Sequence, residues 1–163
     1  MSLLTRLANL EKKVNQKRVE SFYGQHLIRS STNSVIPYVN TVYKNTVQET
    51  GIVTNTTAAG WNFRAYRRCI FIGTASIQGS TTELQIGWSL NSNQLTTGVE
   101  SISANNRLTF FAHTDVTNQF LHSITQVTVL LTPGDTIRLH VTTAMGSQAT
   151  PTLVATFLPV DRD

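Results

Sequence analysis

The sequence predicts an all-β protein, an antiparallel sandwich or barrel, preceded by a short N-terminal helix. The β body is predicted because short apolar or alternating segments follow one another from Val35 onward, and turn residues separate them without helical intervals. Thr, Ser, Asn and Gln replace much of the usual charge, as on a β-rich surface. The helix is predicted because apolar residues recur with heptad spacing in residues 1–20.

The N-terminal segment, residues 1–20, carries a candidate coiled-coil seam. Ser2 is a suitable N-cap for a helix that begins at the next residue. The apolar residues occupy a and d positions of two heptads: Leu3, Leu7, Leu10 and Val14. A seam of this kind lets a helix bury one stripe against copies of itself.

Two charges beside this seam indicate how many helices associate. Arg6 takes a g position and Glu11 an e position, so Arg6 of one chain can pair with Glu11 of its neighbour. The run between them resembles the Arg–apolar–x–x–apolar–Glu signature of trimeric coiled coils. A helix about 28 Å long is marginal alone, so further contacts downstream are expected. The spacing leaves one alternative open, an amphipathic helix packed on its own domain.

Composition places the charge at one end of the chain. Charged residues make up 13% of the sequence, and 40% of residues are hydrophobic, which argues against disorder. Residues 1–30 hold six basic and two acidic side chains, whereas residues 31–163 hold seven of each, so the net charge of +4 lies in residues 1–30. The neutral body makes nucleic-acid binding an unfavoured function. The basic segment could dock on an acidic surface or be a solvated helix exterior.

Cysteine usage and hydropathy exclude several other classes of protein. The single Cys69 cannot form an intrachain disulfide, so no secreted disulfide framework is expected. No signal peptide and no membrane span are expected, since no apolar run is long enough. Synthesis in a cytoplasm is the corresponding expectation.

Residues 21–34 are expected to form a linker or anchoring arm, although residues 21–28 could also be a first strand. Residues 35–163 then form the β body. Its predicted strands lie at 39–47, 52–54, 61–63, 69–77, 83–90, 107–112, 119–131, 136–143 and 151–160. The turn signals between them include Gln78–Ser80, Asn91–Asn93, Asn105–Asn106 and Pro133–Asp135.

Several motifs of the body resemble one known family. They are Val42–Asn45, Gly51–Thr54, Ala59–Gly60, Ile72–Ser76, Gly87–Asn91, Leu130–Leu139 and Thr156–Val160. In this order they resemble the complement-type globular heads and their tumour-necrosis-factor-like relatives. The resemblance implies a ten-strand jelly roll that forms a trimer through one flank. It also implies that the closing strand lies near the trimer axis, which makes Phe157 a candidate trimer contact.

No constellation of residues indicates catalysis or a cofactor. The four histidines have no metal-ligand spacing, and one Cys cannot build a thiolate site. His113, Thr114 and Asp115 could take part in a scattered Ser–His–Asp arrangement, but solvated surface residues are the simpler interpretation. Asp135 is expected to cap the turn at Pro133 and Gly134. We therefore expect no enzyme, no metal and no cofactor.

One cluster mixes arginines with aromatic residues, as ligand sites and the rims of subunit interfaces both do. Its members are Trp61, Arg64, Tyr66, Arg67 and Arg68. Either a bound anion, glycan or nucleic acid, or a subunit interface, would explain the mixture, and the interface is favoured.

Together these features predict a trimeric virion structural protein made in a host cytoplasm, a capsid-surface decoration or short head spike of a virus or bacteriophage. The expected partners are its own copies and other capsid or tail proteins, and a host receptor or glycan is a further candidate. The candidate particle anchors are Lys12, Lys13, Lys17, Arg18, Phe22, Tyr23 and Leu27. A receptor- or glycan-binding head of a phage tail fibre is the alternative, and a jelly-roll enzyme is a distant third.

Overall fold

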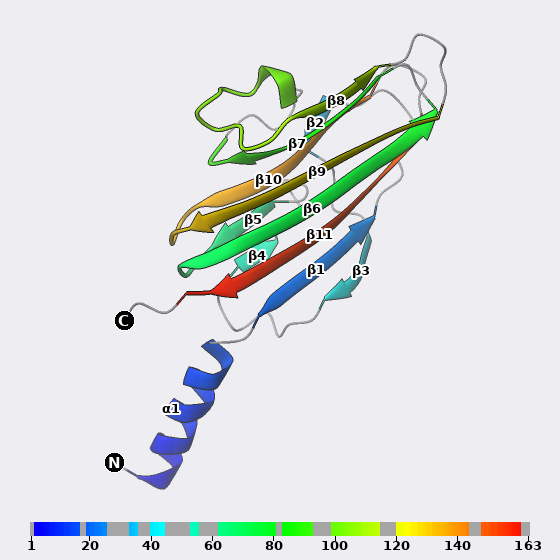
Figure 1. Ribbon diagram of the computed structural model, residues 1–163. Coiled ribbons are helices and arrows are strands. Elements are labelled where there is room, and N and C mark those ends of the chain that lie inside the picture. The colour runs from blue at the N-terminus through cyan, green and yellow to red at the C-terminus, as the bar shows by residue number, and fades with distance from the viewer. Residues whose placement is uncertain are drawn as a thin grey trace.

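The computed structural model describes residues 2–16, 19–25, 33–35, 40–44, 53–55, 62–80, 83–92, 99–114, 120–143 and 148–160. Within these ranges it contains one α-helix, eleven strands and one short 3-10 helix. The strands form two antiparallel sheets, and the helix projects from one end of them (Figure 1).

The first sheet has the strand order β3-β1-β11-β6-β9. Its strands are β1 (Glu20–Gln25), β3 (Asn40–Lys44), β6 (Cys69–Ser80), β9 (Phe120–Leu131) and β11 (Gln148–Pro159). The second sheet has the order β4-β5-β10-β7-β8. Its sixth strand, β2, also pairs with β10. Its strands are β2 (Asn33–Val35), β4 (Val53–Asn55), β5 (Asn62–Ala65), β7 (Glu83–Leu90), β8 (Phe111–Thr114) and β10 (Thr136–Thr143). This two-sheet sandwich with non-consecutive neighbours confirms the predicted antiparallel jelly roll.

The core lies between the sheets and is built from alternate residues of each strand. Its centre is a group of aromatic rings with centroids 5.0 to 5.9 Å apart, and all five are buried: Phe22, Phe63, Phe71, Trp88 and Phe157. Burying each such side chain stabilises the fold by about 1.5–3 kcal/mol. The aromatic group joins strands from both sheets and so fixes how they face one another.

A loop segment covers part of the outer surface of the second sheet. It contains the 3-10 helix Val99–Ser101. Gly87 lets this segment approach, because a Cβ there would lie 2.3 Å from the carbonyl oxygen of Thr109 and 2.4 Å from a methyl of Val99. Trp88 fixes the segment through its carbonyl oxygen, which accepts the backbone N–H of Leu108 at 2.9 Å.

Helix α1 (Leu3–Gln16) begins where the sequence predicts. The Ser2 hydroxyl accepts the backbone N–H of Thr5 at 3.2 Å, and the Ser2 carbonyl accepts that of Arg6 at 3.1 Å. Ser2 is therefore the N-cap. The helix does not pack on its own body, since every described side chain from Ser2 to Glu11 is exposed.

Three expectations are corrected by the sheet topology. Residues 21–34 are not a linker throughout, because β1 lies between β3 and β11 and its Phe22 is 5% exposed. The head therefore begins at Glu20. The predicted strand 107–112 begins only at Phe111, since Arg107 makes an isolated bridge with Ser89. The described residues also hold eleven strands, whereas the family resemblance implied ten.

Candidate assembly surface

The outer face of the first sheet carries a broad surface without formal charge, which we call the uncharged face. Its residues alternate with the core residues of β1, β6, β9 and β11 and therefore point away from the core. They are Ser21, Tyr23, Ile70, Ile72, Thr74, Ser76, Gln78, His122, Ile124, Gln126, Thr128, Leu130, Thr152, Val154, Thr156 and Leu158. None of these described positions holds Lys, Arg, Asp or Glu.

The register of the sheet groups the apolar members of the uncharged face. Leu158 pairs with Ile70, and Ile70 pairs with Leu130, which gives an aliphatic row across three strands. Ile124 and Val154 remain 53% and 47% exposed. A surface of this composition is typical of one that is buried against another protein, because interface cores are depleted of charge.

The polar members of the uncharged face are partly satisfied by one another. The hydroxyls of Ser76 and Thr152 lie 2.8 Å apart, and those of Ser21 and Thr156 lie 3.3 Å apart. Each hydroxyl pair spans two adjacent strands. Burial of these pairs would therefore leave few unsatisfied polar groups.

The helix presents a second unpartnered apolar surface. Leu3, Leu7 and Leu10 are 76%, 52% and 60% exposed, and Leu4 extends the stripe at 81%. Arg6 and Glu11 are exposed beside it, as the heptad assignment requires. The alternative of a helix packed on its own domain is thus wrong for this chain. The side chain of Val14 lies outside the described residues, although its backbone is helical.

Phe157 is not the trimer contact that the closing strand suggested. Its side chain is fully buried, and it lies on the core face of β11 among Phe22, Phe63 and Phe71. The neighbouring residues Thr156 and Leu158 occupy the outward positions. Two adjacent apolar residues, Phe157 and Leu158, made the facing of this strand ambiguous in the sequence.

Of the candidate particle anchors, one side chain lies in the core and one on the uncharged face. Phe22 is a core residue, so its side chain cannot contact a particle while the sheet is intact. Tyr23, the next residue, is half-buried on the uncharged face. The side chains of the other anchors lie outside the described residues: Lys12, Lys13, Lys17, Arg18 and Leu27.

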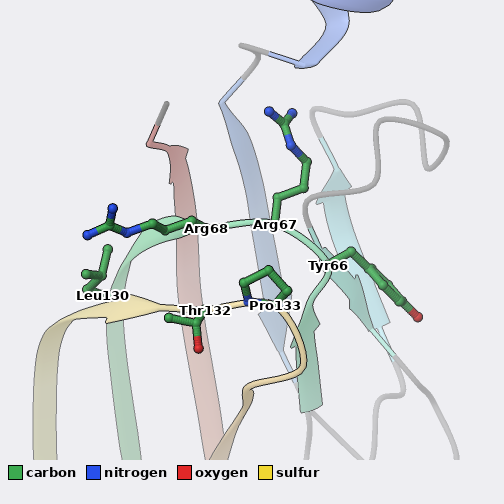
Figure 2. A pocket seen from close by; sticks show the side chains of 6 residues that line it. All are labelled: Tyr66, Arg67, Arg68, Leu130, Thr132 and Pro133. Atoms are coloured by element: carbon green, nitrogen blue, oxygen red, sulfur yellow. The ribbon is translucent and has the colours of Figure 1, made fainter. Parts of the chain in front are cut away.

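The structure brings together part of the arginine and aromatic cluster. Tyr66, Arg67 and Arg68 follow β5 and line a pocket of about 620 Å³ at the end of the sandwich nearest α1 (Figure 2). The other wall is formed by Leu130, Thr132 and Pro133. Arg64 is exposed on β5 and does not line this pocket, and Trp61 lies outside the described residues.

The turn behind this pocket is held by a clamp that the sequence only partly indicated. The Asp135 carboxylate accepts the backbone N–H of Thr132 at 2.7 Å and its hydroxyl at 2.8 Å, so Asp135 caps the turn as predicted. It also accepts a hydrogen bond from the side-chain amide N–H of Asn91 at 2.8 Å, while the side-chain Oδ1 of Asn91 accepts the backbone N–H of Thr136 at 2.8 Å. Asn91 has a left-handed backbone with φ of 55°, which Asn tolerates better than most residues.

Three further reactive side chains, His113, His140 and Cys69, do not line this pocket. His140 is buried and its Nε2 lies 2.6 Å from the Ser89 hydroxyl. Burial, and then the charge of Arg138, lowers the pKa of His140 to about 4. His113 is exposed on β8, and Asp115 lies outside the described residues. Cys69 is buried in the core.

No three His, Cys, Asp or Glu side chains among the described residues are grouped as metal ligands. Within the same ranges no helix is long and apolar enough to cross a membrane.

The chain matches no protein-family model, and no curated protein matches its sequence. Its structure, however, resembles several solved ones. The globular domain of zebrafish complement 1qA superposes with a TM-score of 0.56 at 11% identity, over 90% of this chain and 99% of that one. Eiger TNF from S. frugiperda gives 0.54 at 12% identity, over 89% and 94%.

Murine APRIL at pH 8.0 gives a TM-score of 0.55 at 8% identity, over 86% of this chain and 99% of that one. At such identities the likeness concerns the fold. The described chain therefore has the jelly-roll fold of complement-type and tumour-necrosis-factor-like heads, preceded by a short helix.

Proposed function

We propose that this protein is a homotrimeric structural head whose three copies associate through the uncharged face and through the leucine stripe of α1. The observation that carries this proposal is the uncharged face, with exposed Ile124, Leu130 and Val154 and no formal charge at its described positions. The complement-type and tumour-necrosis-factor-like resemblance implies a trimer. The Arg6 and Glu11 positions favour the same number of chains.

We further propose that the trimer stands on a virion surface, as a capsid decoration or short head spike, with α1 directed toward the particle. A basic helix, a neutral head and a polar uncharged exterior support this orientation. The tail-fibre alternative requires a receptor site at the end away from the helix. The pocket lined by Tyr66, Arg67 and Arg68 lies at the helix end, which favours attachment.

The test of assembly is the mass of the full chain in solution. Native mass spectrometry and sedimentation equilibrium are expected to give a trimer at micromolar concentration. Val154→Asp places a carboxylate in the middle of the uncharged face, and it should convert the head to smaller species because a buried unpaired charge is costly.

The matched control is Phe110→Asp, which adds the same charge at an exposed apolar residue outside the uncharged face. This variant should remain a trimer. A stable monomer from the unaltered chain, or equal dissociation by both variants, would exclude the proposed interface. Immunogold labelling of purified particles then tests the virion location.

A further inference from the structure

We propose that the pocket beside the β9–β10 turn is a docking site for an extended acidic peptide segment of the protein on which the head stands. This inference deepens the proposed attachment and rests on the same orientation of the molecule. It assigns the head its own contact with the partner, separate from the basic helix.

The pocket lies between the segment that follows β5 and the β9–β10 turn, and backbone hydrogen bonds join these two segments. The backbone N–H of Ala65 donates to the Asp135 carbonyl at 2.8 Å, and the N–H of Gly134 donates to the Ala65 carbonyl at 2.7 Å. The N–H of Val160 donates to the Arg68 carbonyl at 3.1 Å and adds the end of β11. Because these bonds fix the backbone before binding, an occupant would lose little affinity to ordering of the site.

The chemistry of the lining selects an acidic and partly apolar occupant. Arg67 and Arg68 supply guanidinium groups, which pair with carboxylates through two parallel hydrogen bonds. Tyr66 and Leu130 are 52% and 44% exposed, and together with Pro133 they offer apolar contact area. Tyrosine and arginine are the residue types that dominate binding energy in protein interfaces.

The directions of the side chains favour an extended segment over one small anion. Figure 2 shows Arg67 projecting toward the side of α1, whereas Arg68 projects toward Leu130. Two diverging guanidinium groups suit carboxylates spaced along a peptide. A nucleic acid would require a wider basic surface, and the described lining holds only these two cations.

The position of the pocket matches the orientation proposed for the head. It lies at the end of the sandwich from which α1 projects (Figure 1). Leu130 belongs both to the pocket and to the uncharged face, so the site borders the proposed contact between copies. A peptide bound there would touch the head beside each subunit boundary.

The experiment measures peptide binding by the full chain with fluorescence anisotropy. The probe is a fluorescein-labelled peptide of Glu, Leu and Gly, and its twin carries Gln in place of every Glu. The acidic peptide should bind at least about tenfold tighter than its twin, and Arg67→Gln with Arg68→Gln should remove about that factor, as expected when charge-assisted hydrogen bonds are lost.

Arg64→Gln removes one exposed arginine from β5 outside the pocket and should leave the affinity unchanged. The proposal is overturned if both peptides bind equally, if Arg64→Gln weakens binding as much as the pocket variant does, or if a single-stranded oligonucleotide competes more strongly than the acidic peptide. Loss of the trimer in the Arg67→Gln, Arg68→Gln variant would show instead that the pocket belongs to the contact between copies.

Native mass spectrometry of the same samples separates this inference from the proposed function. A monomeric chain that binds the acidic peptide through Arg67 and Arg68 would retain the docking site while removing the trimer. A trimer that binds neither peptide would retain the proposed assembly while excluding the docking site.

Discussion

Asp135 links two parts of the chain that are far apart in sequence. Its carboxylate accepts hydrogen bonds from Thr132, at the end of β9, and from Asn91, which follows β7. Partial burial opposes ionisation of Asp135, but the hydrogen bonds from Asn91 and Thr132 outweigh it and hold its pKa below the ordinary value. The ionised carboxylate is therefore the form that the folded state favours.

Replacing Asp135 should destabilise the head without changing its fold. Asp135→Ala leaves the Thr132 N–H and the Asn91 amide without their acceptor, and it should lower the free energy of unfolding by about 1–3 kcal/mol. Urea unfolding at neutral pH measures this loss. Glu100→Gln, at an exposed carboxylate in the covering loop, is the control and should change stability little; equal effects would contradict the clamp.

His140 makes the stability of the head depend on pH. Its folded pKa is about 4, lowered from 6.5 by burial and the charge of Arg138, so between these values the unfolded chain binds a proton that the folded chain does not. Stability should therefore rise with pH across this window, by at most about 1.4 kcal/mol per pH unit, and then level off.

Urea unfolding at a series of pH values tests this dependence. His140→Gln should flatten the slope attributed to His140, whereas His113→Gln, at an exposed position, should leave it unchanged. An identical slope in His140→Gln and the unaltered chain would show that other groups cause it.

Strand β1 shows how one element changes the division of the chain. The residues from Glu20 to Gln25 pair with β11 on one side and β3 on the other. Phe22 contributes a ring to the aromatic group, 5.2 Å from Phe63. Any truncation that removes β1 therefore removes part of the core.

Two truncations should separate the helix from the head. A chain starting at Val19 keeps β1 and should fold into a β-rich head, while a chain starting at Ser34 lacks Phe22 and should be strongly destabilised or insoluble. Circular dichroism and thermal melting distinguish them. Equal melting temperatures would mean that β1 adds nothing to the stability of the sandwich.

The leucine stripe of α1 should contribute to assembly separately from the head. Leu7→Asp with Leu10→Asp removes two candidate seam residues per chain, and each buried leucine stabilises association by roughly 1.5–3 kcal/mol. The trimer should dissociate at higher concentration than before, as measured by sedimentation. Thr5→Asp with Asn9→Asp, which adds the same two charges at exposed positions away from a, d, e and g, serves as the control.

Some elements of the fold are determined by local sequence patterns, and others depend on pairing between distant strands. The heptad leucines, the Ser2 cap, the β9–β10 turn and the long strands β6, β9 and β11 were predictable because local periodicity and turn chemistry determine them. The facing of Phe157 was not, since two consecutive apolar residues fit either face. The place of β1 depends on pairing with β11, more than a hundred residues away in the chain, which no local pattern encodes.

The pocket and the uncharged face were likewise only partly predictable from local sequence. Tyr66, Arg67 and Arg68 are consecutive, so the sequence could predict that they lie together. The other wall of the pocket, with Leu130 and Pro133, required the tertiary fold. The uncharged face could have been anticipated from the sequence, because β6 and β9 hold no Lys, Arg, Asp or Glu at any position.

On the scale of the whole molecule, the net charge is concentrated toward the N-terminus of the chain. Four net positive charges lie in residues 1–30, so a trimer would collect about twelve, and their mutual repulsion favours an acidic partner or counter-ions. Arg67 and Arg68 lie at the same end of the head. This asymmetry supports the orientation that we propose for the head on a particle.

Attachment to particles should weaken with salt but not vanish. Exposed charges are screened over about 8 Å at physiological ionic strength, whereas apolar contacts are retained. A co-sedimentation assay across a salt series measures the bound fraction. The chain starting at Val19, which is expected to fold without the helix, should bind more weakly; undiminished binding would reverse the proposed orientation.

The antiparallel pairing of β1 with β11 has a consequence for the use of this protein as a display scaffold. Because Glu20 stands opposite Phe157, the helix and the end of β11 leave the sandwich on the same side (Figure 1). A peptide fused after Val160 would emerge beside the helix and be hidden on a decorated particle. A peptide inserted between Ser80 and Glu83, where β6 gives way to β7 at the opposite end, would face outward and be accessible to an antibody.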